Sequence, residues 1–292
     1  MKEYLLCSRV EDYFRINEKS SHSMISELSI AYLLQFDDDS LPLTEAMLGS
    51  MPLALYAATH WIDHAKLGGM DPKVLQLILC LFKSESAALI NWVRMQNIDA
   101  EHNLYVDMDV MDLAMDRDKV CSALYYSSLA GMQEVVYCLL HNGENPNAKG
   151  GILGNALQAA SSEGYEEIVK LLLKKGAEVN AEGGYYGNAL YGASINDNEV
   201  IVQLLIENGA EVNVEGGSYG NALQAASYIG NKAIVKLLLE KGAEVNAEGG
   251  FFGNALHAAL SKGNGAIVKL LIENGANIVM GRGNPGVFSD LP

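Results

Sequence analysis

Residues 154–186 read GNALQAASSEGYEEIVKLLLKKGAEVNAEGGYY, and this stretch decides the fold because it recurs along the chain. Close copies begin at Gly187, Gly220 and Gly253, each 33 residues after the last, and a more diverged copy begins at Cys121. A fixed period of this length indicates a helical repeat array in which every copy packs on its neighbours. The predicted copies are residues 121–153, 154–186, 187–219, 220–252 and 253–285.

Each copy predicts two helices followed by a hairpin. In the copy that begins at Gly154, Asn155 is a suitable N-cap, and the short Ala-rich helix that follows should end at Gly164, where a positive φ is expected. A second helix is expected from about residue 165 to 174. It is apolar nearly all round, so we expect it to be buried between neighbouring copies. The Gly-rich end AEVNAEGGYY predicts a turn or hairpin.

These copies resemble ankyrin repeats. They share with that family a Gly after the first helix, a Leu-Leu core in the second helix and a Gly-Ala-x-Val-Asn-Ala end, but Asn-Ala-Leu-Gln at residues 155–158 replaces Thr-Pro-Leu-His. This departure, with a Gly-Gly-aromatic tip, resembles the arrays of fungal NACHT-type proteins. The resemblance covers about residues 121–280. It implies an all-α solenoid with short hairpins, and a protein partner on a concave face lined by hairpin tips and first-helix ends.

The charge balance is acidic throughout. The net charge of the 292 residues is −16, with 10 bases and 19 acids in residues 1–120 and 10 bases and 17 acids in residues 121–292. An acidic surface repels phosphate backbones and anionic lipids, so neither nucleic acid nor a membrane is an expected partner. The excess of acids serves solubility, or it attracts a basic protein partner.

No secretory or membrane-spanning segment is predicted. The N-terminal MKEYLLCSRVEDYF is interrupted by acids, which excludes a signal peptide, and the longest purely apolar run, residues 77–82, is too short to span a bilayer. The spacings of Cys7, Cys80, Cys121 and Cys138 fit no zinc module or disulfide framework. We therefore expect packed, reduced thiols in an intracellular, cytoplasmic protein.

Residues 1–115 predict a separate helical segment. Helices are expected over residues 2–14, over residues 21–36 with Ser21 or Ser23 as the cap, over residues 43–66 in one or two pieces, and over residues 74–97 with a break near residues 84–86. Two groups of residues follow helical spacing on one face: Ile25, Leu28, Ala31, Tyr32 and Gln35 in the second helix, and Leu53, Tyr56, Ala57 and Trp61 in the third region.

This segment also resembles a known family. KEYLLCSRVEDYF and LSIAYLLQFDDD resemble the segment after the nucleotide-binding module of fungal STAND proteins, relatives of NOD-like receptors, and PLALYAATHWIDHAK resembles the stretch that leads into their ankyrin arrays. The resemblance covers roughly residues 1–100. The chain has no Gly-x-x-x-x-Gly-Lys-Ser/Thr loop, so no nucleotide site is assigned.

Within this resemblance, Met1 falls just inside the linker. The resemblance then implies the sensing or autoinhibitory end of a larger receptor. The alternatives are a fragment of a signalling NTPase switch whose catalytic module lies upstream, a non-functional truncated paralogue, and a genuine stand-alone chain.

No set of residues suggests catalysis. His60 and His64 are four residues apart and could share a metal ion, but Trp61 stands where a zinc protease has its general-base Glu, and no third ligand is evident. The acidic run at residues 37–39 lacks the alternation and the Gly of a calcium loop. His257 occupies the family's own repeat-histidine position. We therefore expect no enzyme, no cofactor and no metal site.

Positions that differ between the copies are the candidates for partner contacts. The head Asn and the apolar helix residues stay constant, whereas two adjacent residues at the end of the first helix and one residue at the hairpin tip vary. The candidate contacts are Ile152, Ser162, Glu163, Tyr185, Ile195, Asn196, Ser218, Tyr228, Ile229, Phe251, Ser261 and Lys262. The next tip position is always large and apolar, and we assign Leu153, Tyr186, Tyr219 and Phe252 to packing between repeats. The alternative for the tips is that they only stack on one another.

Two rows of acids recur at the repeat period. Glu182, Glu215 and Glu248 form one row, and Glu178, Glu211 and Glu244 form the other. Stacking would align each row into an acidic stripe, which favours a basic partner or serves only solvation. The tail, residues 286–292, is expected to be frayed.

Overall fold

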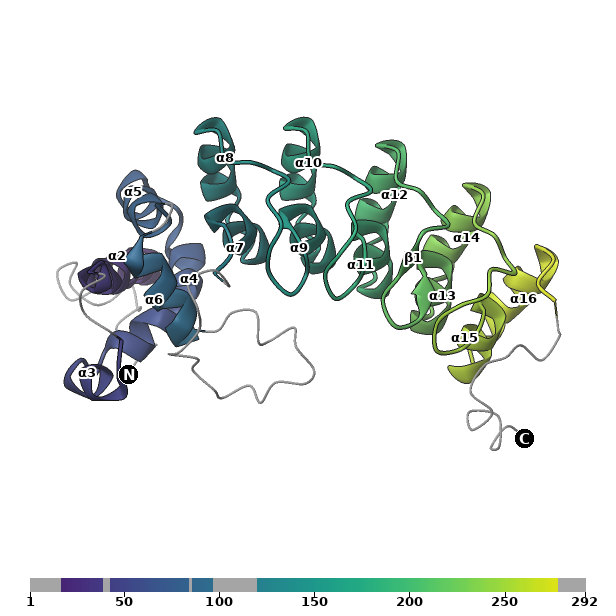
Figure 1. Ribbon diagram of the computed structural model, residues 1–292, viewed down its shortest axis with the longest axis horizontal. Helices are drawn as coiled ribbons and strands as arrows, with labels where there is room; N and C mark the ends of the chain where they lie inside the picture. Colours follow the sequence, from purple (N-terminus) through teal and green to yellow (C-terminus); the bar gives the residue numbers. More distant parts are fainter. Residues whose placement is uncertain (1–16, 39–42, 84–85, 97–119, 278–292) are drawn as a thin grey trace, which may run out of the picture. The chain divides into compact units, whose positions relative to one another are not determined.

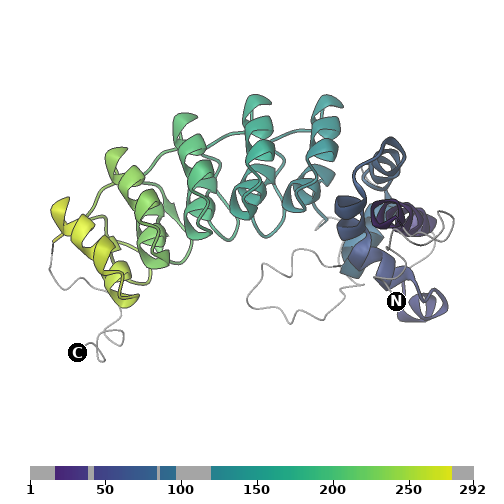
Figure 2. The ribbon, with the colours of Figure 1, turned by 180° about the vertical axis from the view of Figure 1, so that it is seen from behind.

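The computed structural model describes residues 17–38, 43–83, 86–96 and 120–277. The chain divides into two compact units, residues 1–123 and residues 124–292. Both are built mainly of helices (Figure 1 and Figure 2). None of the helices in the described ranges has the length and apolar character needed to cross a membrane. The helix expected over residues 2–14 and the tail at residues 286–292 lie outside the described residues.

The first unit packs its helices around large aromatic rings. Trp61 is fully buried, with ring centroids 5.6 Å from Trp92 and 6.0 Å from Phe82. The Trp92 indole N–H donates to the carbonyl oxygen of Ala58 at 3.0 Å, so this ring also ties two helices together. The elements are α2 (Glu18–Leu33), the 3-10 helix η2 (Leu34–Phe36), α3 (Glu45–Ser50), α4 (Ala54–Gly68), α5 (Pro72–Leu81) and α6 (Ala87–Gln96).

Helix α2 begins earlier than the sequence predicted. The Asn17 side chain accepts a hydrogen bond from the backbone N–H of Ser20 at 3.1 Å, so the helix starts at Glu18. The predicted caps Ser21 and Ser23 therefore lie inside the helix. Asn caps a helix as well as Ser does, so the residue before Glu18 is sufficient to start the helix.

The apolar face that spacing predicted for α2 is not the face that α2 buries. Leu28 is 62% exposed, and Leu53 next to α4 is 59% exposed. The core side of α2 instead consists of Ser26, Ser29, Ile30 and Leu33. Helix α4 approaches this side closely, because a Cβ at Gly68 would lie only 2.3 Å from the backbone nitrogen of Ser23. Small residues on both helices make the close contact possible.

The thiol of Cys80 was expected to be packed, and this was wrong, because its residue is exposed. Helix α5 is amphipathic: Val74, Ile78 and Leu81 are buried, and Cys80 lies away from that side. Cys121 and Cys138 are partly exposed.

The second unit is a row of helix pairs, each pair corresponding to one repeat copy (Figure 1). The first helices of the pairs lie along one side of the row and the second helices along the other. The first helices are α7 (Ala123–Leu129), α9 (Ala156–Glu163), α11 (Ala189–Ile195), α13 (Ala222–Ile229) and α15 (Ala255–Ser261). The second helices are α8 (Gln133–His141), α10 (Glu166–Lys174), α12 (Glu199–Glu207), α14 (Lys232–Glu240) and α16 (Gly265–Glu273).

Hairpins connect the pairs, as the Gly-rich segments predicted. Strands β1 (Glu215–Gly216) and β2 (Gly220–Asn221) pair in antiparallel register, with Gly216 opposite Gly220. Single bridges at Lys149–Asn155 and Gly249–Gly253 mark the equivalent hairpins. The fold is therefore an all-α repeat solenoid with short hairpins.

The head Asn caps the first helix, as predicted. Asn155 accepts from the backbone N–H of Gln158 at 2.9 Å, and Asn188, Asn221 and Asn254 do the same one period apart. Gly164 ends α9 with φ +83°, the left-handed conformation that glycine adopts without strain. These caps explain why the head Asn is the same in the four close copies, whereas the diverged first copy has Ser122 there.

The second helices are more one-sided than the sequence predicted. In α10, Ile168, Val169 and Leu172 are buried, but Leu171 and Leu173 are only partly so. Helices α10, α12, α14 and α16 each pack on the first helix of their own copy, and neighbouring second helices from α8 to α16 pack on one another. The remaining side of each second helix faces outward, so full burial between copies does not occur.

An asparagine near the end of each copy ties it to the next one. The Asn180 amide donates to the carbonyl oxygen of Gly209 at 3.0 Å and accepts from the backbone N–H of Glu211 at 2.9 Å. The same pair of hydrogen bonds recurs at Asn147, Asn213 and Asn246. Because both bonds cross from one copy to the next, this ladder fixes the stacking register of the array.

The fifth residue of the first four copies alternates between tyrosine and glutamine, reading Tyr125, Gln158, Tyr191 and Gln224, and the last copy has His257 there. The Tyr125 hydroxyl accepts from the backbone N–H of Leu153 at 3.3 Å, and the Tyr191 hydroxyl accepts from that of Tyr219 at 3.0 Å. A Cβ at Gly216 would lie 2.6 Å from the Tyr191 ring. The bulky ring therefore requires a glycine in the hairpin beneath it.

The glutamine copies reach the hairpin differently. The Gln158 amide donates to the carbonyl oxygen of Gly183 at 2.9 Å, and the Gln224 amide donates to that of Ala247 at 3.0 Å. The hairpin tips of these two copies each carry two aromatic residues, Tyr-Tyr at residues 185–186 and Phe-Phe at residues 251–252. Two kinds of copy thus alternate along the array.

Candidate functional site

We define the inner face of the array as the first helices together with the hairpin tips. Of the residues predicted to contact a partner, Glu163, Asn196, Ser218, Ile229, Phe251 and Lys262 are exposed, and Ile152, Tyr185, Ile195, Tyr228 and Ser261 are half-buried. The exposed fraction is 49% for Phe251 and 42% for Ile229. This face therefore offers large apolar side chains to solvent.

Ser162 does not belong to this surface, and its prediction as a contact is corrected. It is only 3% exposed, and its hydroxyl accepts a hydrogen bond from the Asn196 amide of the next copy at 3.0 Å. Asn196 is exposed, but its amide also donates to the carbonyl oxygen of Gly192. The variable pair at this helix end thus includes a residue that packs between copies.

Backbone hydrogen bonds join the hairpin tips to one another. The N–H of Tyr185 donates to the carbonyl oxygen of Ile152 at 2.7 Å, and the N–H of Phe251 donates to that of Ser218 at 2.9 Å. Stacking of the tips is therefore real. It involves the backbone, however, and leaves side chains such as Phe251 free to contact another molecule.

An aromatic cluster forms where two tips meet the end of α13. The rings of Tyr219, Tyr228 and Phe252 are stacked, with centroids 4.4 Å apart for Tyr219–Tyr228 and 5.0 Å apart for Tyr228–Phe252. Phe251 packs edge-on against Phe252 at 5.0 Å. The ammonium of Lys262, from the next copy, lies 4.5 Å from the centre of the Tyr228 ring. We call these five residues the aromatic cluster.

The electrostatics of the cluster depend on its two hydroxyls. Burial and a hydrogen bond with Tyr228 raise the pKa of Tyr219 to about 12. The hydrogen bond with Tyr219, together with the nearby ammonium of Lys262, lowers the pKa of Tyr228. The Tyr228 hydroxyl therefore lies next to the two other polar groups of the cluster, the Tyr219 hydroxyl and the Lys262 ammonium.

Sequence reasoning placed Tyr219 and Phe252 in packing between repeats only. Phe252 is 7% exposed and Tyr219 is half-buried, so both do pack. They also hold the Tyr228 ring in place, which the sequence did not reveal. One feature of the sequence could have indicated this contact. Tyr228 is at the end of the first helix of a copy that lies between two hairpin tips with aromatic residues, at residues 218–219 and 251–252.

The acidic rows are exposed on the same hairpins. Glu182, Glu215 and Glu248 are exposed, and so are Glu178, Glu211 and Glu244. They recur at the repeat spacing, so negative charge runs along the array beside the aromatic tips. A partner with basic side chains near an apolar one would complement both features.

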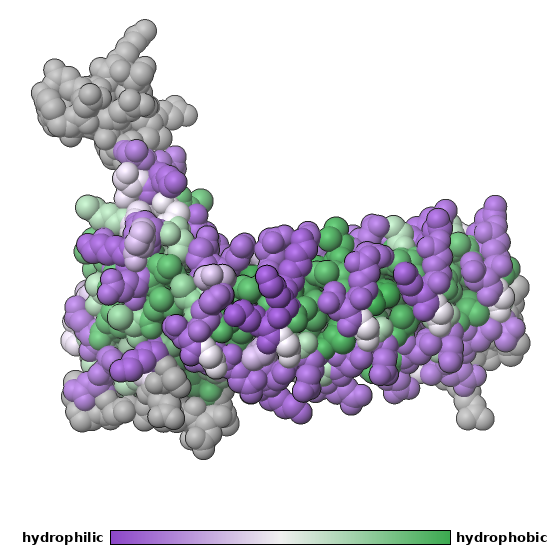
Figure 3. Space-filling view, turned by 90° about the horizontal axis from the view of Figure 1, so that it is seen from above, coloured by the Kyte–Doolittle hydropathy of each residue, from purple (hydrophilic) through white to green (hydrophobic). Residues whose placement is uncertain are grey.

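On the side formed by the second helices, the exposed apolar residues are spread out. Figure 3 shows this side, with hydrophobic residues running along the row between hydrophilic ones. Its exposed large residues include Tyr137 of α8, Val200 of α12 and Ile272 of α16. They belong to different copies, and the one aromatic ring among them, that of Tyr137, packs on His141 of its own helix with ring centroids 3.9 Å apart.

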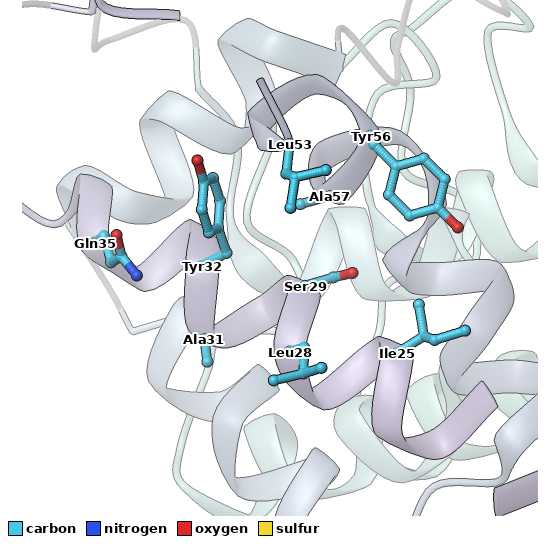
Figure 4. A pocket seen from close by; sticks show the side chains of 9 residues that line it. All are labelled: Ile25, Leu28, Ser29, Ala31, Tyr32, Gln35, Leu53, Tyr56 and Ala57. Atoms are coloured by element: carbon cyan, nitrogen blue, oxygen red, sulfur yellow. The ribbon is translucent and has the colours of Figure 1, made fainter. Parts of the chain in front are cut away.

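The first unit carries a pocket of about 430 Å³ between α2 and α4 (Figure 4). It is lined by Ile25, Leu28, Ser29, Ala31, Tyr32, Gln35, Leu53, Tyr56 and Ala57. These are almost the same residues that helical spacing placed on one face of each helix. The two apolar faces meet around an open groove, and of the predicted set Ala57 and Trp61 are buried in the core.

Comparison with known proteins covers mainly the array. A family model described as "Ankyrin repeats (3 copies)" matches residues 98–183, 123–216 and 190–281. One curated relative, "Azaphilone pigments biosynthesis cluster protein L" of Monascus ruber, is 33% identical over 174 residues. That alignment covers 55% of this chain and 36% of the relative, so the chain spans about a third of the relative's length.

Proposed function

The chain belongs to the ankyrin-repeat family, and from that premise we propose that it is an intracellular, non-catalytic scaffold that binds a protein partner on the inner face of its array. Arrays of this kind present extended surfaces to other proteins. The fold alone does not select a partner, so the argument rests on the side chains of that face.

The observation that carries the proposal is the aromatic cluster. Tyr228, Phe251 and Lys262 differ from their equivalents in the other copies; Tyr228 is half-buried, and the other two are exposed. Stacking holds the Tyr228 ring in one orientation before any partner arrives. Aromatic anchors of this kind add large contact area at a low entropic cost and are frequent binding hot spots.

The acidic rows indicate what the partner carries. We propose a segment that places an apolar or aromatic side chain on the cluster and basic side chains against Glu182, Glu215 and Glu248. The charges then speed encounter and set orientation, whereas the cluster holds the bound state. Binding should weaken as salt rises, because exposed charges are screened over about 8 Å at physiological ionic strength.

Selection of binders to the full chain from a random peptide library tests this proposal. We expect the selected peptides to combine an aromatic or apolar residue with Lys or Arg. Their affinity should fall at least about tenfold for the double variant Tyr228→Ala with Phe251→Ala, since hot-spot residues contribute 2 kcal/mol or more. Replacing the three glutamates by Gln should mainly lower the association rate and its salt dependence.

Tyr137→Ala provides the matched control, because Tyr137 is 50% exposed on a second helix, on the other side of the array. It should leave peptide affinity unchanged. Peptides that bind the double variant as tightly as the parent, or that lose affinity with Tyr137→Ala, would place the site elsewhere.

A narrower form of the proposal makes this scaffold the sensing or autoinhibitory end of a NOD-like-receptor-type protein. Two things support it: the resemblance of residues 1–100 to the linker of fungal STAND proteins, and the presence of a separate helical unit before the array. Mapping the 5′ end of the transcript and sizing the native polypeptide decide it. A product far above 31.5 kDa with an upstream phosphate-binding loop is expected, whereas a product of 31.5 kDa favours a stand-alone scaffold.

A further inference from the structure

Two histidines meet in the first unit although 42 positions separate them in the sequence. His22 of α2 and His64 of α4 face each other with their Nδ1 atoms 2.7 Å apart and their ring centroids 4.9 Å apart. The close crossing at Gly68 and Ser23 holds this part of α2 against α4. The two imidazoles therefore lie on rigid elements and are not brought together by a loop.

The far nitrogen of His64 also has a partner. The Tyr56 hydroxyl, about two helical turns further back on α4, lies 2.8 Å from His64 Nε2. When Nε2–H donates to that hydroxyl, Nδ1 of His64 carries a lone pair directed at His22. Histidines that bind metals commonly have their second nitrogen oriented in this way.

We propose that His22 and His64 form a two-imidazole site for a borderline divalent transition metal such as Zn²⁺, bound through both Nδ1 atoms. Two ligands at about 2.05 Å in tetrahedral geometry have nitrogens about 3.3 Å apart, so the rings need to separate by only about 0.6 Å from their hydrogen-bonded distance. Both residues are partly exposed, which leaves room for water or a partner's side chain in the other positions.

The site rests on two protein ligands. Within the described residues, no cluster of three or more His, Cys, Asp or Glu side chains is arranged to hold a metal ion. His60 is one turn from His64 and is the partner that the sequence indicated, but its ring packs on the Tyr56 ring at 4.8 Å. The sequence indicated the pair His60 and His64 on one helix, whereas the structure brings together His22 and His64 from two helices.

Because the metal would link α2 to α4, binding should also stabilise the first unit. The test is titration of the full, metal-free chain with ZnCl₂, followed by calorimetry and by thermal unfolding. We expect saturable binding of one ion with an accompanying rise in unfolding temperature, and no rise with MgCl₂, since Mg²⁺ prefers oxygen ligands.

Three variants separate this site from ordinary surface histidines. His22→Ala and His64→Ala should each weaken Zn²⁺ binding at least tenfold, whereas His60→Ala should leave it unchanged. His22→Cys, which keeps a zinc-binding side chain at the same place, should retain binding and so exclude a folding defect.

The proposal is overturned if the double variant His22→Ala with His64→Ala binds Zn²⁺ as the parent does. It is equally overturned if His60→Ala removes binding while His22→Ala preserves it, because the ion would then sit on the one-helix pair. Circular dichroism of each variant confirms that α2 and α4 remain folded.

Discussion

The array and the first unit bury their apolar residues by different rules. In the array, a residue type that stays constant from copy to copy is a cap or a core residue, as Asn155 and Leu172 show. In the first unit, the apolar stripe on α2 points into an open groove, and its core side includes Ser26 and Ser29. In the array, equivalent residues of several copies can be compared with one another. For a helix that occurs once, such as α2, only the spacing of its own apolar residues is available.

The physical lesson concerns what an apolar stripe indicates. Helical spacing shows that a face is apolar, but not what covers it. A neighbouring repeat must cover the face of each copy, since no copy can bury its core alone. No such rule applies to α2 and α4, and Leu28 and Leu53 stay exposed beside a closely packed core.

The most direct test of this difference between the two units replaces one leucine in the middle of a helix from each unit. Leu172→Ala in α10 should cost about 2–5 kcal/mol of unfolding free energy, because the side chain is fully buried and leaves a cavity. Leu28→Ala in α2 should change it by less than about 0.5 kcal/mol, because that side chain is 62% exposed. Urea unfolding measures both, and equal costs would mean that the groove is covered in the native protein.

The close helix crossing in the first unit is the next test. Gly68→Ala should cost about 1–3 kcal/mol, because the new methyl would meet the backbone of Ser23 and force the helices apart. Gly49→Ala in α3 is the control, since a Cβ there has no atom within 4 Å, and it should be neutral or stabilising. Thermal unfolding of both variants gives the answer. A harmless Gly68→Ala would show that α2 and α4 can move apart without loss.

Which features could be predicted from the sequence depends on the same difference between repeated and unrepeated segments. The period predicted the helix pairs, the Asn155 cap, the Gly164 stop and the hairpins, because each is a local rule repeated in several copies. The Asn180 ladder was visible as a recurring residue, but its bonds cross between copies, so its purpose appeared only in three dimensions.

Two features of the candidate sites could not be predicted from the sequence. Variation alone did not separate the buried Ser162 from the exposed Phe251, since both positions differ between copies. The meeting of His22 with His64 depends on how α2 crosses α4, and helical spacing could pair His64 only with His60. Tertiary packing decided both cases.

Substitutions in the asparagine ladder measure whether the copies contribute equally to the free energy of unfolding. Asn213→Ala should cost about 1–2 kcal/mol, because it removes the donor to Gly242 and the acceptor for Glu244. Asn213→Asp keeps the acceptor and should cost about half as much. Asn180→Ala should match Asn213→Ala in urea unfolding. A difference above about 1 kcal/mol between them would show that the copies are energetically distinct.

The smallest expected effect is at the last helix pair. Amides in α16 around residues 268–272 should exchange about tenfold faster than those in α14 around residues 235–239, because among the described residues α16 packs against another second helix on one side only. Native-state hydrogen exchange followed by mass spectrometry compares them. Equal protection in the two helices would contradict end-first opening.

The alternation of Tyr191 with Gln158 and Gln224 limits how this array can change its length. Removal of residues 187–219 would bring two glutamine copies together, and the Phe251 tip would face Tyr185 in place of Ser218. Removal of residues 154–219 would leave a tyrosine copy followed by a glutamine copy, as before. Among the first four copies this position therefore repeats every two copies, and a change of length in steps of two keeps each tyrosine copy next to a glutamine copy.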